Sequence, residues 1–384
     1  MIPKGNSPLS ALWTFPSILF SSFIIAWAAE AAQFLMSQGL ALAILAWLQT
    51  LPEFAVEAVI AWQAGKDPTK THLAIANFTG SLRLLVGLGW PMIYFVAAAF
   101  GWREKRKFVN VKLDPEHSVE IFGLLLPILY FTFIWWKGTL SFWDAFPLMA
   151  CYFLYLFVLW KIPPREQEEE ALEDLGVVSR RVLHMQGRAR IAAILGLFVA
   201  GGAILFFSAH PFLDSMLAMA GTLGISTFIF VQWVAPFLSE FPEKLSAFYW
   251  ARKVSTANVA VMNMVSSNIN QWSILSAMIP ILFVISAGTM RPLVFDAHQR
   301  EEILLTILQS FLGFLLLLNL QLKLHEALIL FVFWFVQFVV PSWRGPMIYV
   351  YLGWCIVELI RIVAGRSAPA AWRALRDTLG ERFA

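Results

Sequence analysis

Two stretches of this chain, LPEFAVEAVI at residues 51–60 and FPEKLSAFYW at residues 241–250, carry the same proline–glutamate pair inside long apolar segments. The pair occupies positions 52–53 in the first stretch and positions 242–243 in the second. A proline inside a helix lacks an N–H group and crowds the carbonyl four residues before it. A helix-breaking residue beside a carboxylate, placed twice in apolar surroundings, predicts a buried cation site built from two halves.

The composition indicates a membrane protein. Hydrophobic residues make up 59% of the 384 positions and charged residues 14%, with 34 Phe and 17 Trp. Apolar runs of about twenty residues recur along the chain, which is the length a helix needs to cross a hydrocarbon layer of roughly 30 Å. The sequence therefore predicts an all-α polytopic membrane protein. The two cysteines lie inside apolar stretches and predict no disulfide framework.

Eleven membrane spans are expected from the apolar runs. They are the segments 16–36, 39–62, 72–98, 118–135, 141–161, 191–208, 215–250, 255–286, 301–320, 324–341 and 346–364. The segment 215–250 is too long for one straight crossing, and Pro236 and Pro242 predict two helical pieces there.

The spans divide into two sets of five and one extra. The expected divisions are a first repeat at 1–162, a charged cytoplasmic linker at 163–190, a second repeat at 191–341, and an extra transmembrane helix with an amphipathic cytoplasmic tail at 342–384. Because each repeat has an odd number of spans, the second repeat enters the membrane from the opposite side to the first. The two repeats then have inverted topology, as in many secondary transporters. The motif regions, 46–90 and 236–280, then fall in the second and third spans of each repeat.

Lysine and arginine predict the orientation. They gather in the loops 101–117, 162–190 and 251–254 and in the carboxyl tail, whereas the opposite loops hold only a handful. The positive-inside rule places the basic side in the cytoplasm, with the amino terminus outside, retained rather than cleaved, and the carboxyl terminus inside. The expected partners are membrane lipid and inorganic cations. No nucleic-acid, enzymatic or cofactor motif is present, and the oligomeric state is left open.

The polar residues around the two pairs predict the ligands. A carbonyl left without a partner by a proline must be satisfied in lipid, and a bound cation can do so. Ca²⁺ accepts about six to eight oxygen ligands, and two carboxylates would balance its charge. Polar residues spaced four apart share one helix face. The residues expected to converge are Glu53, Asn77, Ser81, Ser239, Glu243, Asn263, Ser267 and Gln271, with Gln49, Thr50 and Asn268 nearby.

LPE and FPE, each followed by N-x-x-[GS]-S, resemble the two repeats of the cation/Ca²⁺ exchanger superfamily, which includes Na⁺/Ca²⁺ and H⁺/Ca²⁺ antiporters. The resemblance implies exchange of Ca²⁺ or another cation against Na⁺ or H⁺ by alternating access at the bilayer midplane. It implies that Glu53 and Glu243 are the central Ca²⁺ or Na⁺ ligands, with Ser81, Ser239 and Ser267 as hydroxyl ligands. The long regulatory domain of animal members is absent, which implies a prokaryotic type in the inner membrane.

The chain departs from the family pattern in its first half. Leu48-Gln49 stands where Gly-Thr is usual, and Leu85 occupies a position that often carries Asn or Asp and that Gln271 fills in the second half. At least one ligand position is lost. An alternative function therefore remains open, namely a degenerate exchanger-fold protein without transport that serves as a structural or regulatory subunit of a membrane complex.

Charged neighbours are expected to modulate the site. Arg83 either pairs with another carboxylate, with Glu57, Glu30 and Glu120 as candidates, or reaches the cage as a fixed positive charge. Glu57 and Glu240 lie close in sequence to the two motif glutamates. Clustered carboxylates at low dielectric disfavour full ionisation, which suits H⁺ as a coupling ion. Neutralisation by Lys244 and Arg252 is the alternative.

Overall fold

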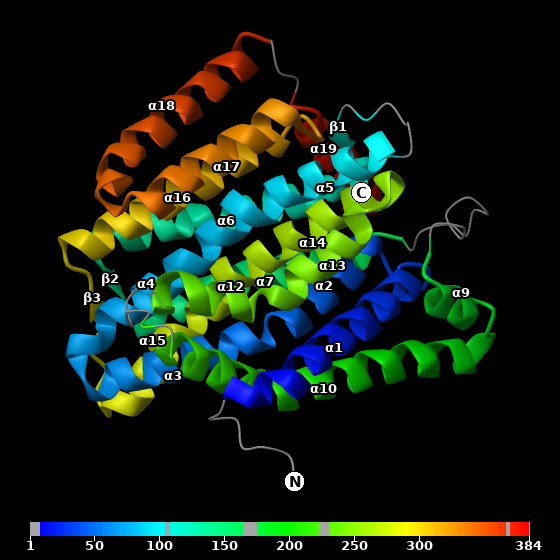
Figure 1. Ribbon diagram of the computed structural model, residues 1–384. Helices are drawn as coiled ribbons and strands as arrows, with labels where there is room; N and C mark the ends of the chain where they lie inside the picture. Colours follow the sequence, from blue (N-terminus) through cyan, green and yellow to red (C-terminus); the bar gives the residue numbers. More distant parts are fainter. Residues whose placement is uncertain are drawn as a thin grey trace.

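The computed structural model describes residues 8–103, 108, 110–163, 175–222, 224, 230–365 and 369–383. The helices form a bundle whose members run mostly along one direction (Figure 1). Helices α1 and α10 pack together on one outer side, and α16, α17 and α18 lie on the opposite side. The helices that carry the two motifs lie between these outer groups (Figure 1). This confirms the expected all-α membrane architecture.

The amino-terminal half contains α1 Ala11–Ala32, α2 Gln38–Gln49, α3 Leu51–Lys66, α4 Thr71–Leu84, α5 Trp90–Arg103, α6 Ser118–Lys137 and α7 Ala145–Lys161. It is followed by α9 Val177–Leu183, α10 Gly187–Thr222, α12 Ala235–Ser239, α13 Phe241–Ala251, α14 Ala257–Asn270 and α15 Ser276–Ala287. The last helices are α16 Ala297–Leu317, α17 Leu324–Val339, α18 Arg344–Val363 and α19 Ala370–Phe383. The described residues include three π-helical turns, at Leu85–Gly89, Phe230–Val234 and Gln271–Leu275.

In the described ranges, two short antiparallel strand pairs connect the halves. Strand β1 Asn110–Lys112 pairs with β4 Gln321–Lys323, and β2 Thr139–Leu140 pairs with β3 Leu293–Val294. The strand pairs lie at opposite ends of the bundle (Figure 1). Helices α9 and α19 lie at the same end as β1, so the described parts of the basic loops and of the tail gather at one end of the bundle. The acidic part of the expected linker, 164–174, lies outside the described residues.

Within the described ranges, seven helical segments have the length and hydropathy to cross a membrane, and the α2–α3 pair makes an eighth as one span bent by 48°. The expected spans 301–320 and 324–341 are helical but fall outside this set. Helix α16 has three charged residues in its first turns, and α17 has only 16 residues. The expected span 215–250 contains residues 223 and 225–229, which lie outside the described residues.

Both proline–glutamate pairs begin a new helix. Helix α2 ends before Thr50 and α3 begins with Leu51, while α12 ends before Glu240 and α13 begins with Phe241. A proline is tolerated in the first turn of a helix because the N–H groups of that turn have no intrahelical partner. The prolines therefore divide each span into two helices in the protein interior rather than kinking one continuous helix.

The following span is also interrupted in both halves. A π-helical turn begins at Leu85, eight residues after Asn77, and another begins at Gln271, eight residues after Asn263. Such turns are uncommon and are often found at functional sites. The matched breaks agree with the expected pair of repeats, which stays a prediction.

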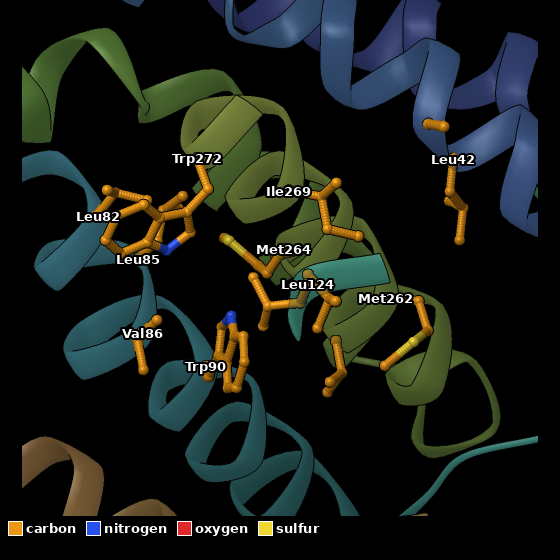
Figure 2. Close-up of a cluster of buried hydrophobic side chains, with 14 of the residues drawn as sticks. Leu42, Leu82, Leu85, Val86, Trp90, Leu124, Met262, Met264, Ile269 and Trp272 are labelled. Carbon is orange, nitrogen blue, oxygen red and sulfur yellow. The ribbon is translucent and has the colours of Figure 1, made fainter. Parts of the chain in front are cut away.

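Apolar side chains hold these two interrupted spans together. Figure 2 shows Leu85 and Trp90 from the first span facing Met264 and Trp272 from the second. Both indole rings are fully buried, and Trp272 Nε1 donates a hydrogen bond to Ser310 Oγ at 3.1 Å. In lipid, helices associate through close packing and hydrogen bonds rather than through exclusion from water. This packing sets the relative position of the polar residues on the same two spans.

Candidate cation site

Glu53 and Glu243 each occupy the third position of a helix that starts inside the protein. Both side chains have no solvent-exposed surface. The first-turn N–H groups of a helix have no intrahelical partner and carry a partial positive charge. The helix breaks therefore place each carboxylate where the backbone favours negative charge.

Groups from both halves of the chain bind the Glu53 carboxylate. Ser81 Oγ lies within hydrogen-bond distance of Glu53 Oε1, and Gln271 Nε2 donates to Glu53 Oε2 at 2.6 Å. The carboxylate of Glu240 shares both neighbours, since it also contacts Ser81 Oγ and lies 3.4 Å from Gln271 Nε2. The structure thus joins Glu53, Ser81, Glu240 and Gln271 in one buried network.

The Ser81 hydroxyl sits between two carboxylates but has only one hydrogen. It can donate this hydrogen to the carboxylate of Glu53 or to that of Glu240, but not to both. The contact between the Ser81 oxygen and the other carboxyl group then needs a hydrogen that this carboxyl group supplies. Two ionised carboxylates sharing one hydroxyl hydrogen would repel each other in these buried surroundings. The network is therefore built to hold at least one additional proton or cation.

Lys244 supplies an internal cation to this network. Its Nζ atom forms an ion pair with Glu240 Oε2, one helical turn away, and both side chains are buried. The expectation that a basic residue neutralises the cluster is therefore correct for Lys244. The described contacts of Arg252 are with the rings of Phe248 and Tyr249, at 5.9 and 5.7 Å, so its placement gives no support to the same role.

Glu243 has no hydrogen-bond partner among the described residues. Both of its carboxylate oxygens are buried and unpaired, and it lies close enough to Glu53 and Glu240 to interact with them electrostatically. A buried carboxylate without a partner carries a large desolvation cost. Further buried oxygens here that lack a hydrogen-bond partner among the described residues belong to Glu57, Asn77, Asn263, Ser267, Asn268, Asn270 and Gln271.

The remaining expected residues are buried but bonded to other groups. Asn77 Nδ2 donates to Glu57 Oε2 at 2.6 Å, so this pair extends the network along α3 and α4. Ser239 Oγ donates to the Pro236 carbonyl at 3.3 Å, which leaves its oxygen lone pairs available. Thr50 Oγ1 donates to the Trp47 carbonyl at 3.0 Å.

Two contributing residues were missed by the sequence reasoning. Asn270 Nδ2 donates to Thr50 Oγ1 at 2.6 Å, and Ser246 Oγ accepts a hydrogen bond from Gln49 Nε2 at 2.5 Å. The Gln49 oxygen in turn lies 3.4 Å from Asn263 Nδ2. The available signal was a polar residue inside an apolar span, which is costly to bury and is therefore a candidate for function.

Gly80 allows the close approach of a third element. A Cβ atom at this position would lie 2.1 Å from the carbonyl oxygen of Gln232, in the π-helical turn that precedes α12. Small residues let helix backbones approach closely in membranes. The glycine of the N-x-x-G-S motif therefore keeps α4 against the helix that leads to Glu240.

Arg83 lies outside this network. Its guanidinium forms an ion pair with Glu302 and donates to Gln337 Oε1 at 2.9 Å. Arg344 Nη1 binds the second oxygen of Glu302 at 2.9 Å. Arg83 therefore pairs with a carboxylate, but none of the three expected candidates was correct, and the alternative of a fixed charge within the cation cage is wrong.

Comparison with known proteins agrees with this geometry. The sodium/calcium exchanger protein family matches residues 8–161 and 193–343. The chain belongs to this family of membrane transporters. The expected resemblance to the cation/Ca²⁺ exchanger superfamily is thereby confirmed.

Solved structures share the fold. The crystal structure of the H⁺/Ca²⁺ exchanger CAX is 33% identical in sequence, with a TM-score of 0.80 over 97% of this chain and 91% of that chain. A structure of the sodium-calcium exchanger NCX_Mj, soaked with Na⁺ and Ca²⁺, has a TM-score of 0.61 at 16% identity over 86% of this chain and 96% of that one, and shows the shared fold alone. A comparison with curated protein sequences found no match.

Proposed function

We propose that this exchanger-family protein is a secondary antiporter that exchanges Ca²⁺ or a chemically similar cation against H⁺ by alternating access. Glu243 and Glu53 are the central ligands in this proposal. The observation that carries it is the pair of buried oxygens of Glu243, which have no hydrogen-bond partner in the described part of the chain. A hard cation is bound by carboxylate, amide and hydroxyl oxygens, which are the groups that surround both glutamates.

The choice of H⁺ as coupling ion rests on the contacts of Ser81. The hydroxyl lies between the carboxylates of Glu53 and Glu240, and Lys244 pairs with the other Glu240 oxygen, so the contacts of Ser81 need an added proton when no transported cation is bound. Binding of a divalent cation would stabilise the ionised carboxylates and release that proton. The 33% identity to an H⁺/Ca²⁺ exchanger supports the same coupling.

We assign the membrane orientation from the positive-inside rule. The described parts of the basic loops lie at the end of the bundle that holds β1, α9 and α19 (Figure 1). That end faces the cytoplasm of a prokaryotic cell in this proposal, with the carboxyl terminus inside and the amino terminus outside. Protease accessibility of α19 in inside-out vesicles, compared with right-side-out vesicles, tests this assignment.

The transport proposal is tested in proteoliposomes with an imposed pH gradient. Uptake of radioactive Ca²⁺ and dissipation of the gradient are measured together for the wild type, Glu53→Gln and Glu243→Gln. The matched control is Glu358→Gln, which removes a buried carboxylate that pairs with Arg361 on α18. We expect coupled flux in the wild type and the control and none in the two site variants. Equal flux in all four proteins would refute the assignment of the ligands.

A non-transporting role is the second candidate. It is favoured by the internal cation Lys244, which already binds Glu240, and by Leu85, a buried apolar residue at the position that Gln271 fills in the second half. In this case no cation gradient drives flux in the wild type, and no cation changes its thermal stability. Copurification of a partner subunit would then identify its role.

A further inference from the structure

A second group of ligand-type side chains lies outside the candidate cation site. Asp114, Glu116 and His117 stand in and just before the 3-10 turn Pro115–His117, which leads from β1 into α6. One potential ligand atom from each residue lies within 4.8 Å of the others. None of these three residues was assigned a role from the sequence.

The imidazole of His117 is buried and has a free nitrogen directed at this group. The side chain has no exposed surface, and Nε2 makes no hydrogen bond with the described residues. Nε2 lies 3.7 Å from Asp114 Oδ2, which is too long for a hydrogen bond. Two ligands of a tetrahedral Zn²⁺ ion, each about 2.1 Å from the metal, lie about 3.4 Å apart. The spacing is therefore close to that of two ligands of one ion.

The other ring nitrogen has the partner that metal-binding histidines use. His117 Nδ1 lies 3.4 Å from Glu120 Oε1, and Glu120 is also buried. Donation from Nδ1 to the carboxylate leaves the Nε2 lone pair free. A histidine that ligates a metal usually donates its second N–H to a carboxylate or carbonyl, which orients the ring and increases its basicity.

The position of Asp114 is also held from a distant segment. Asn258 Nδ2, near the start of α14, donates to Asp114 Oδ2 at 2.7 Å. Helix α14 carries Asn263 and Ser267 of the candidate cation site further along its length. The Asp114 side chain is 48% exposed, so an ion can enter from the aqueous side.

We propose that Asp114, Glu116 and His117 bind a first-row transition-metal dication of the Zn²⁺ class, with water completing the coordination. One nitrogen and two carboxylate ligands suit Zn²⁺, whereas Ca²⁺ and Mg²⁺ prefer oxygen ligands alone. The hydrogen bond from Asn258 supports the ligand Asp114 from the start of α14. The site is separate from the proposed transport site and does not depend on its function.

The test measures metal binding by the full-length protein in detergent. After treatment with a chelator and gel filtration, Zn²⁺ is titrated by calorimetry in the presence of excess Mg²⁺, and Co²⁺ is titrated by its visible absorption. We expect one Zn²⁺ per chain, and a Co²⁺ spectrum typical of low-coordinate nitrogen and oxygen ligation. Asp114→Asn and Glu116→Gln should each weaken Zn²⁺ binding by about tenfold or more.

The controls separate this site from adventitious binding. His117→Gln should abolish the Co²⁺ spectrum, but because His117 is buried, the two carboxylate variants carry the test if that variant does not fold. His325→Gln, which changes a histidine that is about half exposed, should bind Zn²⁺ like the wild type. Unchanged affinity in both Asp114→Asn and Glu116→Gln, or an equal loss in His325→Gln, would overturn the proposal.

Discussion

The ion pair between Arg83 and Glu302 gives a quantitative prediction about stability. Glu302 accepts from Arg83 on one oxygen and from Arg344 on the other, and all three side chains are buried. Glu302→Gln keeps the shape of the side chain but leaves two guanidinium groups without a negative partner. Removing one partner of a buried ion pair costs about 3–5 kcal/mol.

This cost can be converted into a change in melting temperature. An unfolding entropy of about 2.1 cal/mol/K per residue amounts to about 0.8 kcal/mol/K for a chain of this length. The expected decrease in Tm of Glu302→Gln is therefore about 4–6 °C. The assay is tryptophan-fluorescence thermal unfolding in detergent, for which the 17 Trp residues provide the signal.

The neighbouring Glu301 provides the control because it is exposed. Glu301→Gln should shift Tm by less than about 1 °C, as expected for a surface carboxylate. If Glu302→Gln is as stable as Glu301→Gln, the Arg83 cluster is not an important structural element. Arg83 would then be available for the cation site, and the assignment of its charge to Glu302 would be refuted.

Three further changes test the site itself. Ser81→Ala removes the hydroxyl shared by the carboxylates of Glu53 and Glu240. A hydrogen bond to a charged group contributes about 1.5–3 kcal/mol, so its loss should lower Ca²⁺-driven H⁺ flux about 10- to 100-fold. Unaltered flux would contradict the bridging role of Ser81. Lys244→Met removes the internal cation, so Ca²⁺ no longer competes with the Lys244 ammonium for the carboxylates. The attraction between Ca²⁺ and the carboxylates should increase by about 1 kcal/mol, which lowers the Ca²⁺ concentration for half-maximal thermal stabilisation about fivefold. Weaker Ca²⁺ binding by this variant would argue against such competition. Gly80→Ala places a methyl group 2.1 Å from the Gln232 carbonyl and should destabilise the protein by about 1–3 kcal/mol in thermal unfolding. At Gly345, an added methyl group would meet no atom of the described residues within 4 Å, so a similar loss of stability in Gly345→Ala would show that the effect is not steric.

Most of the fold could be predicted from the sequence because each feature is local. Apolar runs of membrane length mark most of the helices, and Pro236 and Pro242 predict the division of the segment 215–250, whereas the matching division of 39–62 at Leu51 was not predicted. Hydropathy alone describes helix α16 poorly, because its first turns carry charged residues within an otherwise apolar helix. Glu302 is nevertheless buried there because Arg83 and Arg344 bind it.

The candidate site was predictable in its residue types but not in its contacts. Spacing of four residues places Asn77 and Ser81 on one face of α4, and the motif resemblance singles out Glu53 and Glu243. Nothing in the spacing indicates that Ser81 contacts Glu240. Asn270 was missed because no local pattern connects it to Thr50, which lies 220 residues away.

The sequence alone therefore determined the class of the protein, the positions of most of its helices and the chemistry of the buried groups, although α10 runs unbroken from Gly187 to Thr222 across the gap expected between the spans 191–208 and 215–250. These properties depend on composition and on neighbours within one or two helical turns. Only the tertiary structure decided that Gln271 binds Glu53, that Lys244 rather than Arg83 supplies the positive charge in the network, and that Glu243 is left without a hydrogen bond among the described residues. These outcomes depend on how helices distant in the sequence pack against one another, and helix packing has no short-range signature in the chain.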